Sequence, residues 1–185
     1  TFLDVDGDQC QDLVMMFGTS GKNTDAIAGL EDGWIDGEEQ PDVILKGDCN
    51  GNFERTDGWG FGDPARGRSV AVGDLDRDGQ PDLVTTGKYY LKTWHLSGGC
   101  GERVVLTLNA GPNNTHGIGA RVIVEVAGRT TYQWMLPGTA SSSSAAEIFV
   151  GLGGYSSAER ITVEWLEGGT TVIEDVGVGR VVLER

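Results

Sequence analysis

Short runs of alternating or β-branched residues fill the second half of the chain. In "RVIVEV" and "RITVEW", Val and Ile fall on one face and charged residues on the other, which is typical of a half-buried antiparallel strand. Turns rich in Gly, Asn or Ser separate the runs, and "EGGTT" at 167–171 predicts the clearest hairpin. The runs are "RVVLTLN", "ARVIVEVAG", "TTYQWML", "EIFVGLG", "RITVEWL", "TTVIEDV" and "RVVLER". They predict an antiparallel β-sandwich or small barrel over residues 101–185.

The first half carries strand-like runs that each follow an acidic turn, such as "QDLVMMFG" and "PDLVTTG". The chain has 185 residues with 30 Gly and 5 Pro, no long apolar run and no sustained helical periodicity. This composition favours many short strands joined by tight turns. We therefore expect an all-β protein, with a repeat region in residues 1–100 followed by the 101–185 domain.

The stretch "GDLDRDGQPDLV", residues 73–84, has an aspartate at every second position before it runs into apolar residues. If Asp74 is position 1, carboxylates fall at positions 1, 3, 5 and 9, and "FLDVDGDQCQDLV" near the start repeats this spacing. Position 7 would contribute a backbone carbonyl. The predicted ligands are Asp74, Asp76, Asp78, Gln80 and Asp82 in the second loop, and Asp4, Asp6, Asp8, Cys10 and Asp12 in the first.

Calcium is the metal that these loops fit best. Four neighbouring carboxylates repel one another, and Ca²⁺ accepts six to eight irregular oxygen ligands, whereas Mg²⁺ requires a near-ideal octahedron. The second loop has Gly79 at position 6, where a permissive backbone is needed, but the first has Gln9 there and is expected to be weaker. The alternative is an acidic turn without an ion, because aspartate side chains also bond the local backbone.

A third, degraded copy of the pattern is "WIDGEEQPDVIL". Asp36, Glu38 and Asp42 align with carboxylates of the second loop, but Trp34 stands at position 1. We interpret it as the start of a strand and not as a metal site.

The net charge of −14 belongs almost entirely to the first half. Residues 1–86 hold 19 Asp and Glu against 6 Lys and Arg, and residues 87–185 hold 9 against 8. Such a field repels nucleic acid and anionic membranes and attracts cations, so we expect no nucleic-acid partner. No segment of the sequence is apolar and long enough to span a membrane.

The stretches "VILKGDCNGNFERTDGWGF" and "GRSVAVGDLDRDGQPDLVTTG" resemble the FG-GAP, or VCBS, repeats of calcium-bearing β-propellers. "NNTHGIGARVIVEV", "VGLG" and "VEWLEGG" are similar to motifs of the ASPIC/UnbV domain, which follows such repeats in secreted proteins. In the last motif, Leu166 and Glu167 replace Pro and Asp. The resemblance implies partial β-propeller-like repeats, an extracellular setting and calcium as a cofactor.

Propellers usually close with about four to eight blades, and this chain has material for about two. It could be a fragment of a longer propeller, it could pack two blades on the C-terminal sandwich, or it could complete its sheets with neighbouring subunits. Our hypothesis is the third, because exposed strand edges invite pairing, and head-to-tail pairing would produce a filament.

Cys10, Cys49 and Cys100 allow one disulfide in three pairings, and Asn113 starts a glycosylation sequon, with an unmodified turn as the alternative. His95 and His116 lack an accompanying nucleophile motif, so we expect no enzyme, with glycoside hydrolysis as a remote alternative.

The expected function is adhesion or structural assembly through self-association or other extracellular partners. The alternative is a calcium-dependent, lectin-like module whose aromatic side chains stack on glycans, although core packing is the favoured role for these rings. The rings concerned are Trp34, Trp59, Tyr89, Tyr90, Trp94, Tyr132 and Trp134.

Overall fold

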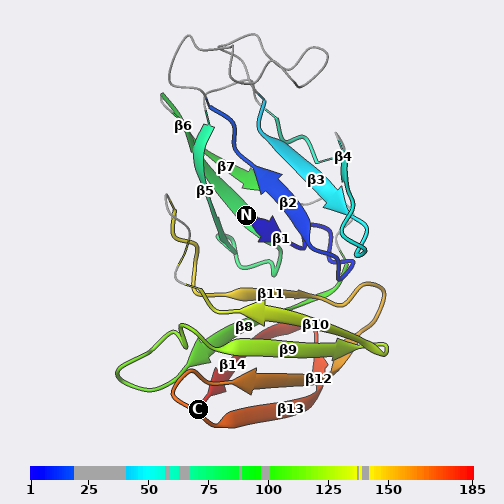
Figure 1. Ribbon diagram of the computed structural model, residues 1–185, viewed down its shortest axis with the longest axis vertical. Helices are drawn as coiled ribbons and strands as arrows, with labels where there is room; N and C mark the ends of the chain where they lie inside the picture. The colour runs from blue at the N-terminus through cyan, green and yellow to red at the C-terminus, as the bar shows by residue number, and fades with distance from the viewer. Residues whose placement is uncertain are drawn as a thin grey trace.

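The computed structural model describes residues 1–18, 41–56, 59–62, 67–87, 89–96, 101–136, 138 and 142–185. Over these residues the chain is all-β, with 14 strands arranged in four sheets. The sheets form two lobes along the long axis of the molecule, with β1 to β7 in one lobe and β8 to β14 in the other (Figure 1). No helix in the described part of the chain is long and apolar enough to cross a membrane.

The first lobe contains two small antiparallel sheets with strand orders β1-β2-β3-β4 and β5-β6-β7. In each sheet, an acidic loop connects the first two strands, so the loop ends where an apolar strand begins. The strands are β1 (Phe2–Leu3), β2 (Asp12–Met15), β3 (Val43–Gly47), β4 (Phe53–Arg55), β5 (Gly67–Gly73), β6 (Asp82–Gly87) and β7 (Leu91–His95). The two sheets confirm the expectation of partial, propeller-like repeats.

The second lobe is a sandwich of two sheets, ordered β10-β9-β12-β13 and β11-β8-β14. All seven runs predicted from the sequence form strands, and Gly168 and Gly169 in the β12–β13 turn have positive φ. Among the described strands, no sheet closes into a barrel. The strands are β8 (Arg103–Asn109), β9 (Arg121–Val126), β10 (Arg129–Trp134), β11 (Ile148–Gly151), β12 (Ser157–Glu164), β13 (Thr170–Gly177) and β14 (Gly179–Glu184).

The sandwich differs from the prediction in one strand pair, because β14 runs parallel to β8. Only Val178 separates β13 from β14, yet β13 pairs with β12 in one sheet and β14 pairs with β8 in the other. The chain therefore changes sheets at Gly177–Gly179 instead of forming a hairpin, and Gly179, with φ of 127°, provides backbone geometry that few other residues adopt.

The sheet β11-β8-β14 contributes to two hydrophobic cores. Val104 and Leu106 of β8 face the sandwich core, whereas Val105 of β8 and Phe149 of β11 pack in the core of the first lobe. Alternation explains this arrangement, since neighbouring residues of a strand point to opposite faces. The two small sheets thus pack on the sandwich, the second of the three arrangements considered above. The predicted boundary at residues 100 and 101 lies next to 97–100, which are outside the described residues.

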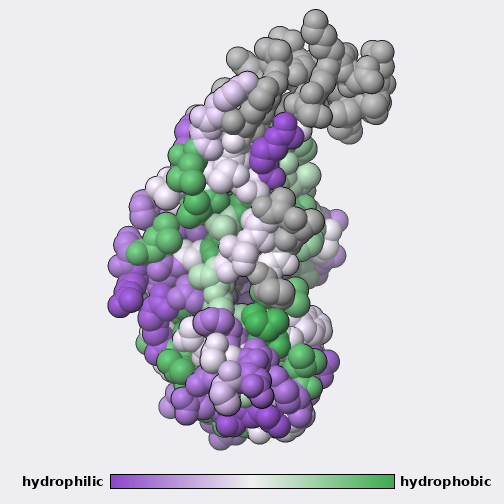
Figure 2. Space-filling model, turned by 90° about the vertical axis from the view of Figure 1, so that its left-hand side faces the viewer, coloured by the Kyte–Doolittle hydropathy of each residue, from purple (hydrophilic) through white to green (hydrophobic). Residues whose placement is uncertain are grey.

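The distribution of polar residues on the surface agrees with the two-sheet arrangement of the second lobe. Figure 2, a view from the side of Figure 1, shows hydrophilic residues gathered at the end of the molecule formed by the C-terminal sheets. On the face of the β10-β9-β12-β13 sheet that points away from the core, Arg160 pairs with Glu125 and Glu174, and Arg121 pairs with Glu164. This face is solvated, and the apolar residues of the same strands face inward.

Candidate metal centre

The two acidic loops share one local hydrogen-bond pattern. In the second loop, the backbone N–H of Asp78 donates to Asp76 at 3.1 Å, and that of Gln80 donates to Asp78 at 2.7 Å. Each carboxylate therefore caps the backbone two residues onward, which is the turn chemistry of aspartate. The first loop repeats the pattern with Asp8 donating to Asp6 and Cys10 donating to Asp8.

Both loops also share their backbone conformation at positions 4 and 6. Gly7 and Gln9 have φ of 76° and 73° in the first loop, and Arg77 and Gly79 have φ of 66° and 89° in the second. Each loop thus has one glycine and one residue with a side chain in the left-handed region, where a side chain costs about 1–2 kcal/mol. The glycine in the first loop has moved to position 4, yet the turn is the same.

The second loop brings the carboxylates of Asp74, Asp76 and Asp82 together, with one oxygen of each lying within 4.8 Å of the others. The side chain of Asp74 is fully buried. Its Oδ2 accepts hydrogen bonds from Gly79 N–H at 3.0 Å and from Arg180 at 2.6 Å, but its Oδ1 is buried without a partner. A buried, unpaired carboxylate oxygen is costly, so this atom fits a cation ligand.

Other side chains around the second loop have positions that the sequence did not reveal. His95 Nδ1 lies 2.9 Å from Asp82 and 3.7 Å from Asp76. Glu147 accepts the N–H of Asp74 at 3.1 Å and an Arg180 hydrogen bond at 2.7 Å. Only the cross-strand pairing of Asp82 with His95 and the folding of β14 beside β8 bring these groups to the loop.

The structure assigns different places to the remaining predicted ligands of this loop. Asp78 does not belong to the three-carboxylate cluster, and one of its oxygens accepts the N–H of Gln80. The side chain of Gln80 is directed to Arg103, whose Nε donates to it at 2.8 Å. Gln80 could thus contribute only its backbone carbonyl.

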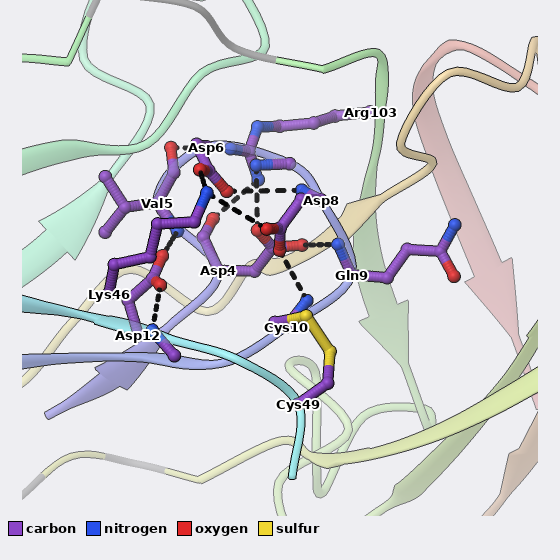
Figure 3. Close-up of polar contacts among 12 residues, drawn as sticks. Asp4, Val5, Asp6, Asp8, Gln9, Cys10, Asp12, Lys46, Cys49 and Arg103 are labelled. Carbon is purple, nitrogen blue, oxygen red and sulfur yellow. Dashed lines mark hydrogen bonds and ion pairs between the residues drawn. A yellow bond between two sulfur atoms is a disulfide. The ribbon is translucent and has the colours of Figure 1, made fainter. Parts of the chain in front are cut away.

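The first loop brings Asp4, Asp6 and Asp8 together, but a lysine lies among them (Figure 3). Lys46 extends from β3, and its Nζ forms ion pairs with Asp6 and, at 3.1 Å, with Asp8. The hydrogen bonds to Asp6 and Asp8 raise the pKa of Lys46 above its usual range, so its charge is permanent at any physiological pH.

The other two carboxylates of the first loop are occupied by the backbone. Asp4 accepts the N–H groups of Gly7 and Gln9 at 2.7 and 3.0 Å. Burial raises the pKa of Asp4 to about 6, although Arg103 and these N–H groups lower it. Asp12 accepts N–H groups at 2.7 and 2.9 Å, and burial raises its pKa. These four oxygens are satisfied inside the protein, so the first loop fits a metal ion less well than the second.

Comparison with protein families agrees with this geometry. Residues 4–85 match the FG-GAP-like repeat, and residues 110–183 match the family described as ASPIC and UnbV. The chain joins an FG-GAP-like repeat to an ASPIC and UnbV region. No curated protein matches it.

A disulfide fixes the first loop of the FG-GAP-like repeat. Cys10, at position 7, is bonded to Cys49 in the turn between β3 and β4. Sequence alone left three pairings open, and Cys100 lies outside the described residues. In the same turn, hydrogen bonds from Asn52 and Asn50 lower the pKa of Asp48 to about 2. This part of the "VILKGDCNGNFERTDGWGF" stretch is thus a tight, exposed turn attached to the acidic loop.

The third copy of the repeat is only partly described, because Trp34, Asp36 and Glu38 lie outside the described residues. Asp42 is buried and accepts hydrogen bonds from the N–H of Phe17 at 2.9 Å and the hydroxyl of Tyr90 at 3.0 Å. It precedes β3 directly, as expected for the start of a strand.

The first acidic loop docks on the "GLG" motif of the ASPIC and UnbV region. Gly153 N–H donates to Gly7 O, and Gly101 N–H donates to Asp6 O, both at 2.7 Å. A side chain at Gly151 would overlap the Asp4 carboxylate, which explains the glycine at this position. The motif therefore supplies close backbone approach to the acidic loop.

Arg103, at the start of β8, connects both acidic loops. Its side chain is buried and donates to the carbonyls of Asp4 and Val5 at 2.7 Å each, besides its bond to Gln80. Sequence reasoning missed it, because Arg103 reads only as the first residue of a strand. A single arginine thus joins the two repeat loops to the sandwich.

The aromatic residues divide into two groups. Trp59 and Trp94 are partly buried against the core of the first lobe, as predicted, and Phe61 packs there too. Tyr132 and Trp134 on β10 are 55% and 52% exposed, so the core-packing interpretation is wrong for both. Their strand alternates, but its inward residues are Thr131 and Gln133 instead of the rings. Tyr89 is also exposed, and Trp34 is outside the described residues.

Proposed function

We propose that the chain is an extracellular, non-enzymatic adhesion or structural protein, stabilised by one calcium ion at the second acidic loop. The observation that carries the proposal is the buried, unpartnered Oδ1 of Asp74 beside the carboxylates of Asp76 and Asp82. When bound, Ca²⁺ would neutralise these carboxylates. Asp74, Asp76 and Asp82 would hold it, with the Gln80 carbonyl as a further oxygen ligand.

The position of this loop gives the ion a structural role. The loop begins at the end of β5, and the segment before β11 is bonded to it through Val72 and Asp74. Arg180 of β14 binds both Asp74 and Glu147. Fixing the loop therefore fixes the contact between the repeat and the sandwich, and surfaces on both lobes keep one mutual orientation.

An extracellular location is supported by the Cys10–Cys49 disulfide, since such bonds persist in oxidising compartments. The FG-GAP-like repeat supports the same location. Asn113 of the sequon is exposed, which a glycosylated asparagine requires.

The test is a melting experiment on the purified chain with calcium and with a chelator. Calcium at about 100-fold above its dissociation constant should stabilise the wild type by about 2.7 kcal/mol. Asp76→Asn retains an oxygen for the N–H of Asp78 but removes the charge, so it should abolish most of this gain. Asp6→Asn is the matched control and should leave the gain intact. An equal gain in wild type and Asp76→Asn would disprove the assignment.

Self-association through strand edges remains part of the proposal. Strands β4, β7, β10 and β13 each lie at the edge of a sheet in the described structure, which is the position from which a strand can pair with another chain. Light scattering in calcium should then show growth with protein concentration. A stable monomer at high concentration would refute filament formation while leaving the calcium site in place.

The second candidate is glycan binding, favoured by Tyr132 and Trp134. These rings project from the same face of β10, two residues apart, and more than half of each is exposed. Exposed aromatic rings are suitable platforms for sugar stacking. A glycan array comparing the wild type with Tyr132→Ser combined with Trp134→Ser would test it: reproducible binding lost in the variant supports a lectin, and no binding rules it out for the glycans tested.

A further inference from the structure

Lys46 and His95 occupy equivalent positions in the two repeats. In the second repeat, Asp82 at loop position 9 pairs across the sheet with His95. In the first, Leu13 pairs with Leu45, so continuing this antiparallel register by one residue sets Asp12 opposite Lys46. Each side chain reaches back from the strand after the loop strand to the acidic loop of its own repeat. The fold thus has a defined position for a basic side chain beside each loop.

The ammonium group of Lys46 lies against the carboxylates that cluster in the first loop. Its ammonium contacts Asp6 and Asp8, two of the three carboxylates that cluster in the first loop (Figure 3). A lysine ammonium is a compact point charge with three donors, so it can neutralise several carboxylates at once. His95 differs in geometry, since it approaches the carboxylates of Asp82 and Asp76 through one ring nitrogen, Nδ1, at 2.9 and 3.7 Å.

The other oxygens of the first loop are also less available to a metal ion than those of the second, because more of them already accept hydrogen bonds. Asp4 and Asp12 each use both oxygens for backbone N–H groups, and Arg103 occupies the carbonyls of Asp4 and Val5. In the second loop, Arg180 contacts Asp74 only at Oδ2, and Oδ1 stays unpaired. Both loops were built with the same turn, so the difference comes from their surroundings.

We infer that Lys46 is a tethered cation that replaces a metal ion in the first acidic loop, so that the chain has one calcium-binding loop and one self-neutralised loop. The inference rests on the proposed function for the assignment of calcium to the second loop. It makes Lys46 the residue that decides whether the first loop binds an ion, although both loops share one backbone conformation. Exchanging the side chains at 46 and 95 should exchange the metal occupancy of the loops.

The test counts calcium ions by titration calorimetry on the full 185-residue chain after chelator treatment. The wild type should bind one ion, Asp76→Asn none and Lys46→Gln two. Lys46→Gln combined with Asp76→Asn should bind one, at the first loop. The matched control is Lys92→Gln, which makes the same change in charge at a lysine that lies over the rings of Tyr90 and Trp94, and it should still bind one.

Two ions on the wild type, or equal numbers on the wild type and Lys46→Gln, would overturn the inference. No ion on the wild type but one on Lys46→Gln would disprove the proposed function and support the inference, so the two failures are distinguishable. If Lys46→Gln is unfolded in chelator, calcium should restore the wild-type circular dichroism spectrum, and a failure to recover would overturn the inference. The reciprocal variant His95→Lys should lose the ion at the second loop. If this variant still binds that ion, the inference is overturned.

Discussion

Replacing Arg180 by glutamine tests whether an arginine and a calcium ion share Asp74. Arg180 donates to Asp74 at 2.6 Å and to Glu147 at 2.7 Å. Removing one partner of a buried ion pair costs about 3–5 kcal/mol, because the other charge remains uncompensated. The Asp74 side chain is fully buried but that of Arg180 is 35% exposed, so water screens part of the interaction. We expect Arg180→Gln to lower the free energy of unfolding by about 2 kcal/mol in chelator.

Calcium should reduce this loss, because the ion would supply a second positive charge to Asp74. If the loss falls to about 0.6 kcal/mol, linkage requires calcium to bind the variant about tenfold more tightly than the wild type, since 1.4 kcal/mol is a factor of ten. Urea denaturation with and without calcium measures how far the loss of stability falls, and titration calorimetry measures how much more tightly the variant binds calcium. The calcium-dependent change in the free energy of unfolding and the change in the free energy of calcium binding must agree within error.

Arg160→Gln is the matched control for Arg180→Gln. Arg160 pairs with Glu125 and Glu174, but its side chain is 47% exposed and both partners are accessible. Exposed ion pairs contribute about 0–1 kcal/mol, so this variant should lose little stability and its loss should not depend on calcium. An equal loss for Arg180→Gln with and without calcium, or weaker calcium binding by that variant, would refute the sharing of Asp74.

Three further predictions concern the loops and their supports. Gly79→Ala should destabilise the protein by about 1 kcal/mol, because φ is 89° there but no atom obstructs a Cβ; a chemical melt checks this, and no loss would show that the turn adapts. Cys49→Ser should lower the free energy of unfolding by about 4 kcal/mol from loop entropy alone, given a separation of 39 residues; a loss equal to that of an exposed Ser substitution would contradict it. Burial raises the pKa of Asp42 in the folded protein above its unfolded value of about 3.9. Protonated Asp42 therefore stabilises the fold fully below the unfolded pKa, and this contribution is lost as pH rises through the folded pKa. Asp42→Asn stays neutral, so its stability relative to the wild type should increase from pH 4 to 7 in urea melts with chelator, and a flat difference would refute the burial argument.

The strands were predictable because alternation and β-branched runs are local properties of the sequence. All seven runs of the second half form strands, and the β12–β13 hairpin closes at its predicted glycines. The parallel pairing of β14 with β8 was not predictable in this way. Val178 is one residue between two strand-like runs, and nothing local distinguishes a hairpin from a change of sheet.

The candidate site was predictable only within each loop. The spacing of aspartates identified both turns, but it did not predict the left-handed conformation that Gln9 and Arg77 adopt without being glycine. Lys46, His95 and Arg180 come from other strands, so their distances to the carboxylates depend on sheet register and lobe packing. Alternation similarly predicted that half of β10 faces inward but not which half, and the rings of Tyr132 and Trp134 face solvent.

The shared β11-β8-β14 sheet bears on how the protein can be divided. Val105 and Phe149 are almost completely buried on the face that meets the repeat sheets, and Arg103 ends in the repeat loops. A piece comprising residues 101–185 alone would expose this apolar face together with an unpaired guanidinium, and the repeat alone would lose one wall of its core. The two family regions should therefore melt in a single calorimetric transition, and a cut between them should yield pieces that aggregate or bind each other again.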